Sequence, residues 1–178
     1  MRSRKLKAPE GMDTRPTADR VKEALFSILT NRLFGARVLD LYGGSGALAL
    51  EALSRGAGSA VIADISPKAC QAIQENIDSL GCGGRAGLLR MKDTAALTAL
   101  SKKGDSFDLI FLDPPYRMNT APICAMIEKL GLLRKQGMIV VEHSRETPPE
   151  ILPPLALTDH REYGAAGLSF YQRAGEEG

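Results

Sequence analysis

A helical pattern of apolar side chains opens the regular part of the chain. Apolar residues recur at the spacing that places them on one helix face, at Val21, Ala24, Leu25, Ile28 and Leu29. Thr17 precedes them, and a threonine hydroxyl is a good acceptor for the free N–H groups of a helix start. The pattern predicts a helix that begins after an N-cap at Thr17.

Farther along, short apolar runs alternate with segments of helical spacing. The runs predict strands at residues 37–42, 60–64, 86–91, 107–112 and 137–142, and helices at 47–53, 71–77, 94–100 and 120–133. After four prolines, residues 157–163 and 168–172 are expected to form a terminal hairpin. This alternation is typical of a Rossmann-like α/β fold, with a mostly parallel central sheet, helices on both faces and a C-terminal antiparallel hairpin.

Four aspartates lie at or just after the ends of expected strands: Asp40, Asp64, Asp93 and Asp113. The carboxyl ends of parallel strands meet at one edge of a sheet, where the binding crevice of such folds lies. We therefore expect the four acids to border one crevice.

A glycine-rich turn joins the first expected strand to the next helix. Gly43-Gly44-Ser45-Gly46 allows positive φ and close ligand approach, and the helix start offers free N–H groups. Asp64 lies 21 positions after Gly43 (64 − 43), about the spacing of a ribose-binding carboxylate in nucleotide-binding units. A solvated acid at a strand end is the alternative for Asp64.

Two cofactor classes fit this turn, because residues 44–49 also match the degenerate G-x-G-x-x-A pattern of dinucleotide enzymes. Asp40 decides between them. A carboxylate at the mouth of the turn would repel a pyrophosphate, whereas it would attract the ammonium and sulfonium groups of S-adenosylmethionine. We therefore favour S-adenosylmethionine, and Asp40 could also cap nearby backbone N–H groups.

Asp93 has two interpretations that spacing alone leaves open. Its carboxylate could accept a hydrogen bond from the adenine amino group of the cofactor. It could also be the N-cap of the helix expected at residues 94–100, and spacing slightly favours this second interpretation.

The tetrapeptide Asp113-Pro114-Pro115-Tyr116 follows the apolar run 107–112. An exocyclic amine on a flat base is a poor nucleophile, because its lone pair is delocalised into the ring. The Asp113 carboxylate and the Pro114 carbonyl could accept its N–H groups, and Tyr116 could stack on an extruded base. An ordinary strand-ending turn is the alternative, but the aromatic residue and the upstream glycine turn favour catalysis.

Composition fits one globular domain spanning residues 1–178, with 44% hydrophobic and 25% charged residues. The sequence has no internal repeat, no apolar run long enough to span a bilayer and no signal-peptide pattern, so we expect a cytoplasmic protein. Cys70, Cys82 and Cys124 lack metal-ligand spacing, which favours reduced thiols and no bound metal.

Basic residues gather at the start of the chain although the net charge is only +2. Residues Arg2, Arg4, Lys5, Lys7, Arg15, Arg20 and Lys22 could form an edge that faces phosphates. A solvated, mobile tail is the alternative. His143 and His160 receive no catalytic role, because an amine loses its proton most easily after methylation, and we expect both to be satisfied strand-end or surface residues.

These motifs together resemble a known family, the bacterial 16S ribosomal RNA guanine-N2 methyltransferases of the RsmD type, which are Rossmann-like class I methyltransferases. The resemblance covers most of the chain. It lies in Arg15-Pro16-Thr17-Ala18-Asp19-Arg20 and the residues up to Phe26, in residues 40–48 and 51–57, and in residues 113–116. The first of these blocks is the most specific to the family.

The resemblance implies an S-adenosylmethionine-dependent enzyme that methylates the N2 amine of a guanine in 16S rRNA, free or within the small ribosomal subunit. We expect a monomer. The implied catalytic residues are Asp113, Pro114, Pro115 and Tyr116. The implied cofactor contacts are Asp40, Tyr42, Gly43, Gly44, Ser45, Gly46, Asp64, Ile65, Asp93 and Thr94. The implied RNA contacts are Arg2, Arg4, Lys5, Lys7, Arg15, Thr17 and Arg20.

The chain departs from the family pattern in three places. Residues 63–66 read Ala-Asp-Ile-Ser where the family has a V-E-x-D-like pattern, so the ribose carboxylate is shorter and a second acid is absent. Tyr42 and Gly44 stand where Phe and Ala are common. The family usually has a further R-I-I-G-G-like strand ahead of the basic start, so we expect residues 1–16 to be a shortened RNA-binding extension.

Three rival functions remain. A DNA adenine N6-methyltransferase, or another N-methyltransferase with a D-P-P-Y motif, would share the turn and the tetrapeptide, although the chain has little room for a separate target-recognition region. A nicotinamide oxidoreductase would leave Asp40 unexplained. A non-catalytic RNA-binding module would explain the basic start but not the aligned acids.

Overall fold

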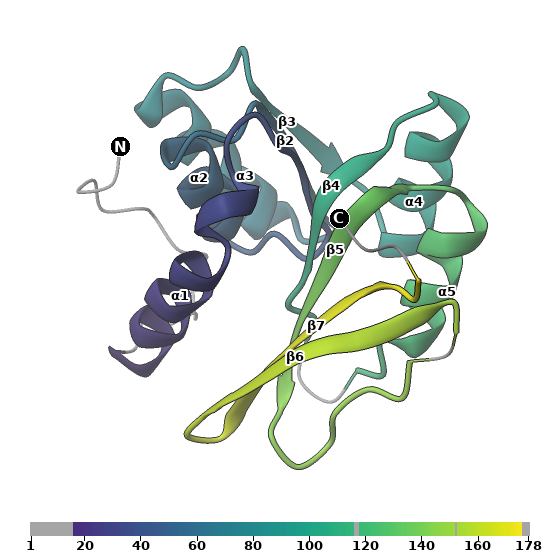
Figure 1. The fold of residues 1–178 in the computed structure, drawn as a ribbon. Coiled ribbons are helices and arrows are strands. Elements are labelled where there is room, and N and C mark those ends of the chain that lie inside the picture. The colour runs from purple at the N-terminus through teal and green to yellow at the C-terminus, as the bar shows by residue number, and fades with distance from the viewer. Residues whose placement is uncertain (1–15, 116–117, 152, 176–178) are drawn as a thin grey trace.

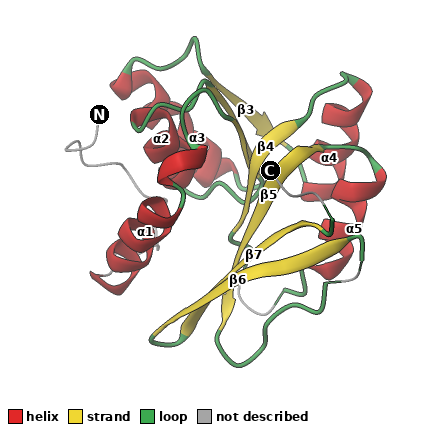
Figure 2. Ribbon diagram, in the orientation of Figure 1, coloured by secondary structure: helices red, strands yellow, loops and turns green. Residues whose placement is uncertain are grey.

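The computed structural model describes residues 16–115, 118–151 and 153–175. Helices and strands alternate through most of this range (Figures 1 and 2). The helices are α1 (Pro16–Ile28), η1 (Thr30–Arg32), α2 (Ala47–Ser54), α3 (Pro67–Leu80), α4 (Asp93–Lys102) and α5 (Ala121–Lys129). The strands are β1 (Arg37–Asp40), β2 (Ser59–Asp64), β3 (Ala86–Arg90), β4 (Phe107–Leu112), β5 (Leu133–Ser144), β6 (Leu155–Tyr163) and β7 (Ala166–Arg173).

The strands form one seven-stranded sheet in the order β3-β2-β1-β4-β5-β7-β6. The first five strands in this order are parallel, and β7 pairs antiparallel with both β5 and β6. Each parallel connection passes through a helix, as parallel strands require. The prediction of a mostly parallel sheet with a C-terminal antiparallel hairpin is confirmed.

Helices cover both faces of the sheet, as predicted. One core cluster joins side chains of α1, α2 and α3 to alternate strand residues such as Val38 and Phe111. The other joins α4 and α5 to the intervening residues, among them Leu39 and Ile110. Figure 1 shows the same division, with α1, α2 and α3 on one side and α4 and α5 on the other.

Helix α1 is anchored to the centre of the sheet by an aromatic pair. The Phe26 ring meets the Phe111 ring of β4 edge to face, with centroids 6.0 Å apart, and both side chains are buried. The predicted N-cap at Thr17 is wrong, because α1 begins at Pro16 and Thr17 lies within the helix. Proline suits the first helical position, since its fixed φ is helical and its missing N–H needs no partner.

The predicted helix 120–133 is too long at its C-terminal end. Helix α5 ends at Lys129, and Gly131 adopts a left-handed φ of 68°. The N–H of Leu132 reaches the Ile127 carbonyl at 3.1 Å, and that of Gly131 reaches the Glu128 carbonyl at 3.1 Å, which is the Schellman arrangement. The chain then turns back, so that Leu133 starts β5 beside Phe107 instead of ending a helix.

None of the helices within the described ranges is long and apolar enough to cross a membrane. The three cysteines are buried and free, as expected for reduced thiols.

Candidate active site

The acids predicted to share a crevice do lie at one edge of the sheet. Asp40 and Asp64 are the last residues of β1 and β2, and Asp113 follows the last residue of β4. Asp93 is the first residue of α4, just beyond the end of β3. Because these four strands are parallel neighbours, their carboxyl ends point the same way and bring the acids to one edge.

The glycine turn is held close to β2 by its own backbone. The N–H of Gly43 donates to the Ala63 carbonyl at 2.9 Å, and that of Gly46 donates to the Gly43 carbonyl at 2.7 Å. Gly44 and Gly46 have φ values of 61° and 81°, a region that favours glycine. A Cβ on Gly43 would lie 2.3 Å from a methyl carbon of Ile62, so the approach itself requires glycine.

Asp64 acts as a clamp between the glycine turn and the next helix. Its Oδ2 accepts the backbone N–H of Gly44 at 3.0 Å, and its Oδ1 accepts that of Ser66 at 2.9 Å. Ser66 in turn caps α3 by accepting the N–H of Ala69. Asp64 is therefore a partner of the backbone, and the alternative of a merely solvated acid is wrong. Ile65, also predicted at the cofactor site, is 64% exposed beside it.

Asp40 is the least satisfied group of the site. Its side chain is 1% exposed, and neither carboxylate oxygen has a hydrogen-bond partner among the described residues. Burial, with added repulsion from Asp113 and Asp64, raises the pKa of Asp40 to about 7, and the nearby Ala49 N–H offsets part of this rise without reaching hydrogen-bond geometry. This interaction with the Ala49 N–H, in the first turn of α2, is the contact that supports the alternative role of Asp40 as a cap of backbone N–H groups.

Tyr42 and Asp93 form a hydrogen-bonded pair beside the glycine turn. The Tyr42 hydroxyl donates to Asp93 Oδ2 at 2.7 Å, and burial and the neighbouring carboxylate raise the pKa of Tyr42. Asp93 Oδ1 accepts the N–H of Thr94 at 2.7 Å. The N-cap of α4 is Lys92, so the interpretation of Asp93 as that N-cap is wrong.

Glu142 is a member of the site that sequence reasoning missed. It follows the buried residues 138–141 of β5, and the register between β4 and β5 pairs Leu112 with Val141. The residues that come next, Asp113 and Glu142, are thereby neighbours, and their carboxyl groups share a hydrogen bond. Only the strand order and register identify this contact, because nothing in the local sequence of Glu142 signals it.

Burial raises the pKa of both carboxyl groups in this pair. The side chain of Asp113 is open to solvent, yet the protein around it displaces much of its water, as expected at the wall of a crevice. Glu142 is the more buried of the two side chains, so burial favours its protonated form and makes it the donor in the hydrogen bond to Asp113. Asp113 is thus the member of the pair that keeps the negative charge.

Several predicted site residues lie outside the described residues: Tyr116, Arg2, Arg4, Lys5, Lys7 and Arg15. Pro114 and Pro115 follow Asp113 at the site edge, Ser45 and Gly46 precede α2, and Arg20 is exposed on α1. The structure brings together the predicted cofactor residues and Asp113 to Pro115.

His143 follows Glu142 on β5, and His160 lies on β6. Their rings stack with centroids 5.8 Å apart, and Ser169 Oγ lies 2.7 Å from His143 Nε2 and 3.0 Å from His160 Nδ1. Burial lowers the pKa of His143. Both rings are hydrogen-bonded, in agreement with the expectation of satisfied positions.

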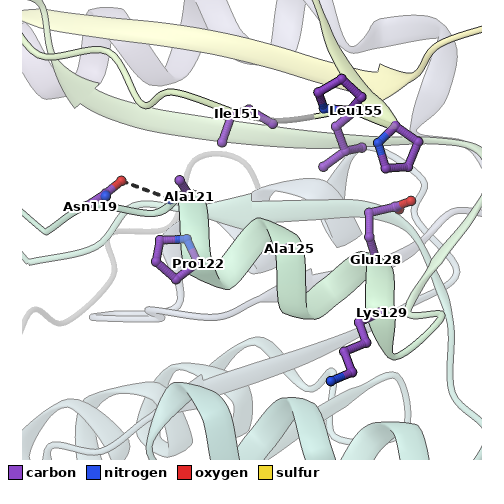
Figure 3. A pocket seen from close by; sticks show the side chains of 10 residues that line it. Asn119, Ala121, Pro122, Ala125, Glu128, Lys129, Ile151 and Leu155 are labelled. Atoms are coloured by element: carbon purple, nitrogen blue, oxygen red, sulfur yellow. Dashed lines mark hydrogen bonds between the residues drawn. The ribbon is translucent and has the colours of Figure 1, made fainter.

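A cavity of about 620 Å³ between α5 and the segment that leads into β6 contains none of the predicted site residues (Figure 3). It is lined by Asn119, Ala121, Pro122, Ala125, Glu128, Lys129, Ile151, Pro153, Pro154 and Leu155. No group of three or more His, Cys, Asp or Glu side chains within the described ranges could hold a metal ion.

The fold and this row of acids around a glycine turn define a class I, Rossmann-like methyltransferase. Residues 1–172 match the family described as Conserved hypothetical protein 95, and the chain belongs to that family. The resemblance noted from the sequence motifs is thereby confirmed.

Two similar proteins that are named as ribosomal RNA methyltransferases support this family assignment. The chain is 38% identical over 176 residues to "Putative rRNA methyltransferase YlbH" of Bacillus subtilis, covering 98% of this chain and 96% of that protein. It is 34% identical over 174 residues to ribosomal RNA small subunit methyltransferase D of Escherichia coli K12, covering 97% and 86%.

Solved structures agree in fold. The Escherichia coli protein yhhF matches with a TM-score of 0.82 and 33% identity, covering 96% of this chain and 92% of that one. SMU.776, solved in complex with SAH, is more distant, with a TM-score of 0.63 and 13% identity, and shows the shared fold alone.

Proposed function

We propose that the protein transfers the methyl group of S-adenosylmethionine to the exocyclic N2 amine of a guanine in 16S ribosomal RNA. The observation that carries the proposal is the placement of Asp113-Pro114-Pro115 beside Asp40 and the glycine turn at one sheet edge. The proposed cofactor residues and the proposed acceptors for an amine would then lie side by side at this edge. The names of the relatives support ribosomal RNA as the substrate class.

The cofactor suits the residues that are present. Asp40 leaves two buried, unpaired carboxylate oxygens, and the ammonium or sulfonium of S-adenosylmethionine would supply the positive charge that they lack. Gly44 adopts a left-handed φ of 61°, and no side chain caps the start of α2. A dinucleotide pyrophosphate would instead meet the charge of Asp40 and the nearby Asp113.

S-adenosylmethionine, when bound, supplies an electrophilic methyl group. The work of the protein is to hold the acceptor amine in line with it. We propose that the Asp113 carboxylate and the Pro114 carbonyl accept the two N–H groups of N2, which localises the nitrogen lone pair. Tyr116 is proposed to stack on the guanine, and Asp64, Ile65, Asp93 and Thr94 to surround the adenosine part of the cofactor.

The RNA is proposed to lie along the basic start of the chain, with Arg20 and Lys22 on α1 as the described members of that set. We further propose one methyltransferase domain that acts as a monomer, without a metal, in the cytoplasm.

The test is nucleoside mass spectrometry after incubation with labelled S-adenosylmethionine and, separately, 30S particles, naked 16S RNA and duplex DNA. We expect labelled N2-methylguanosine in an RNA sample. Labelled N6-methyladenine in DNA would favour the rival adenine methyltransferase instead, and label in no sample would refute the proposed reaction.

Asp113→Ala supplies the site-specific arm of this test. We expect it to abolish transfer while leaving the Kd for S-adenosylmethionine within a few-fold of the wild-type value, because Asp113 is proposed to hold the acceptor. Asp78→Ala, on the exposed side of α3, is the matched control. Unchanged turnover in Asp113→Ala would remove Asp113 from the mechanism.

A further inference from the structure

The carboxyl pair at the ends of β4 and β5 has a definite geometry. The two strands run parallel with Phe111 beside Val140 and Leu112 beside Val141, and Asp113 and Glu142 are the next residues after the last of these pairs. Glu142 is also fixed from the other side, because it pairs with Leu168 of β7. The β5 backbone is therefore held by β4 as far as Val141 and by β7 through Glu142, whereas Asp113 begins the loop that leaves the sheet.

The charges around the pair are mostly negative. Asp40, at the end of β1, lies close enough to Asp113 for the charge of Asp113 to raise the pKa of Asp40. On the other side of β5, Leu168 of β7 is paired with Arg161 of β6, and the Arg161 side chain forms an ion pair with Asp159. Among the described groups, no cation contributes to the pKa shift of either Asp113 or Glu142. A proton between the two carboxyl groups is the remaining way to avoid two adjacent charges.

The hydrogen bond between the two groups has a direction, because Glu142 is half-buried whereas Asp113 is exposed, and the more buried carboxyl is the one that keeps its proton and donates. A carboxylate has about four lone-pair positions, so one bond from Glu142 leaves the others for a ligand. It also fixes the rotation of the Asp113 carboxylate, which otherwise has solvent on its open side. An acceptor that must receive an amine N–H in line with a methyl donor needs this kind of support.

We propose that Glu142 is a positioning residue for methyl transfer, and that its carboxylic acid form donates a hydrogen bond that orients the Asp113 carboxylate toward the guanine N2. The proposal rests on the proposed function and extends it. It assigns to Glu142 a role that depends on keeping its proton, so the activity should fall at alkaline pH when that proton is lost and the two carboxylates repel each other.

Two substitutions separate this role from a structural one. Glu142→Gln retains a donor that cannot be lost with rising pH, and Glu142→Leu removes the donor at similar volume. Glu146→Gln, on the exposed segment after β5, is the matched control. The experiment measures single-turnover rates on the RNA substrate from pH 6 to pH 10, together with the Kd for S-adenosylmethionine and the thermal stability of each variant.

We expect Glu142→Leu to slow methyl transfer roughly 10- to 100-fold, the loss typical of a charge-assisted hydrogen bond, with nearly unchanged cofactor binding. Glu142→Gln should remain within about threefold of the wild type at neutral pH and lose the alkaline fall in rate. Titration of the guanine itself would change the rates of the wild type and of Glu142→Gln equally, so it cancels when their pH profiles are compared. Glu146→Gln should reproduce the wild-type profile.

The proposal is overturned if Glu142→Leu turns over like the wild type, or if Glu142→Gln keeps the same alkaline fall. Failure of the proposed function gives a different result, because the wild-type protein would then form no N2-methylguanosine in the same assay. A general loss of folding is also distinct, since it would weaken cofactor binding and lower the melting temperature of both Glu142 variants.

Discussion

Asp40 offers a test in which one substitution should stabilise the free protein and weaken its cofactor site. The pKa of this carboxyl lies at about 7 in the folded protein, against an ordinary value of 3.8. A raised acid pKa means that folding takes up a proton, so its contribution to stability is present below 3.8 and is lost as pH rises to about 7. At pH 8 the buried charge acts against folding in full.

The size of the effect follows from the same shift. Between pH 5 and pH 7 the loss is about two pH units at ~1.4 kcal/mol each, or roughly 3 kcal/mol as an upper value. For a chain of this size, each kcal/mol moves the melting temperature by about 2–4 °C. Asp40→Asn lacks the charge. The melting temperature of the variant minus that of the wild type should therefore be about 6–12 °C higher at pH 8 than at pH 5.

The assay is thermal unfolding of both proteins without cofactor at the two pH values. At each pH the melting temperature of the wild type is subtracted from that of Asp40→Asn, and the two differences are compared. Any effect of the amide on packing is the same at both pH values and therefore cancels. Asp78→Asn, an exposed change of the same type on α3, should show no such dependence. The Kd for S-adenosylmethionine should rise roughly 10- to 100-fold in Asp40→Asn, since a charged hydrogen bond is lost. An equal difference at pH 5 and pH 8 would refute the reasoning.

Two further substitutions probe the turn and the tetrapeptide. Gly43→Ala places a methyl group 2.3 Å from a side-chain carbon of Ile62, so we expect a loss of about 1–3 kcal/mol in thermal or urea unfolding, and a stability equal to that of the wild type would contradict the tight approach. Tyr116→Ala should slow methyl transfer more than Tyr116→Phe, because phenylalanine still offers a ring face; equal losses in single-turnover rates would argue against stacking.

Local patterns were sufficient to predict the parallel part of the sheet. Buried strands read as continuous apolar runs, and an acid at the end of a run marks where the chain leaves the core, which located Asp40, Asp64 and Asp113. The predicted end of α5 was wrong because the apolar pattern continues through Leu130, Leu132 and Leu133 after the helix has stopped. Gly131 carried the stop signal.

Contacts between distant residues were beyond the reach of those patterns. The bonds from Asp64 to the Gly44 and Ser66 N–H groups depend on the exact path of the turn backbone. Glu142 becomes a neighbour of Asp113 only when β5 lies beside β4 in one particular register. Sequence spacing of 29 positions (142 − 113) carries no information about that pairing.

The strand order also sets when the sheet can be completed during synthesis. Strand β7, residues 166–173, is hydrogen-bonded on both sides, so β5 keeps an open, apolar edge until the last strand has been made and has left the ribosome. An unpaired edge of that kind invites pairing with other chains. A chain released just before residue 166 would therefore retain the five parallel strands but leave the β5 edge that carries Glu142 open to aggregation.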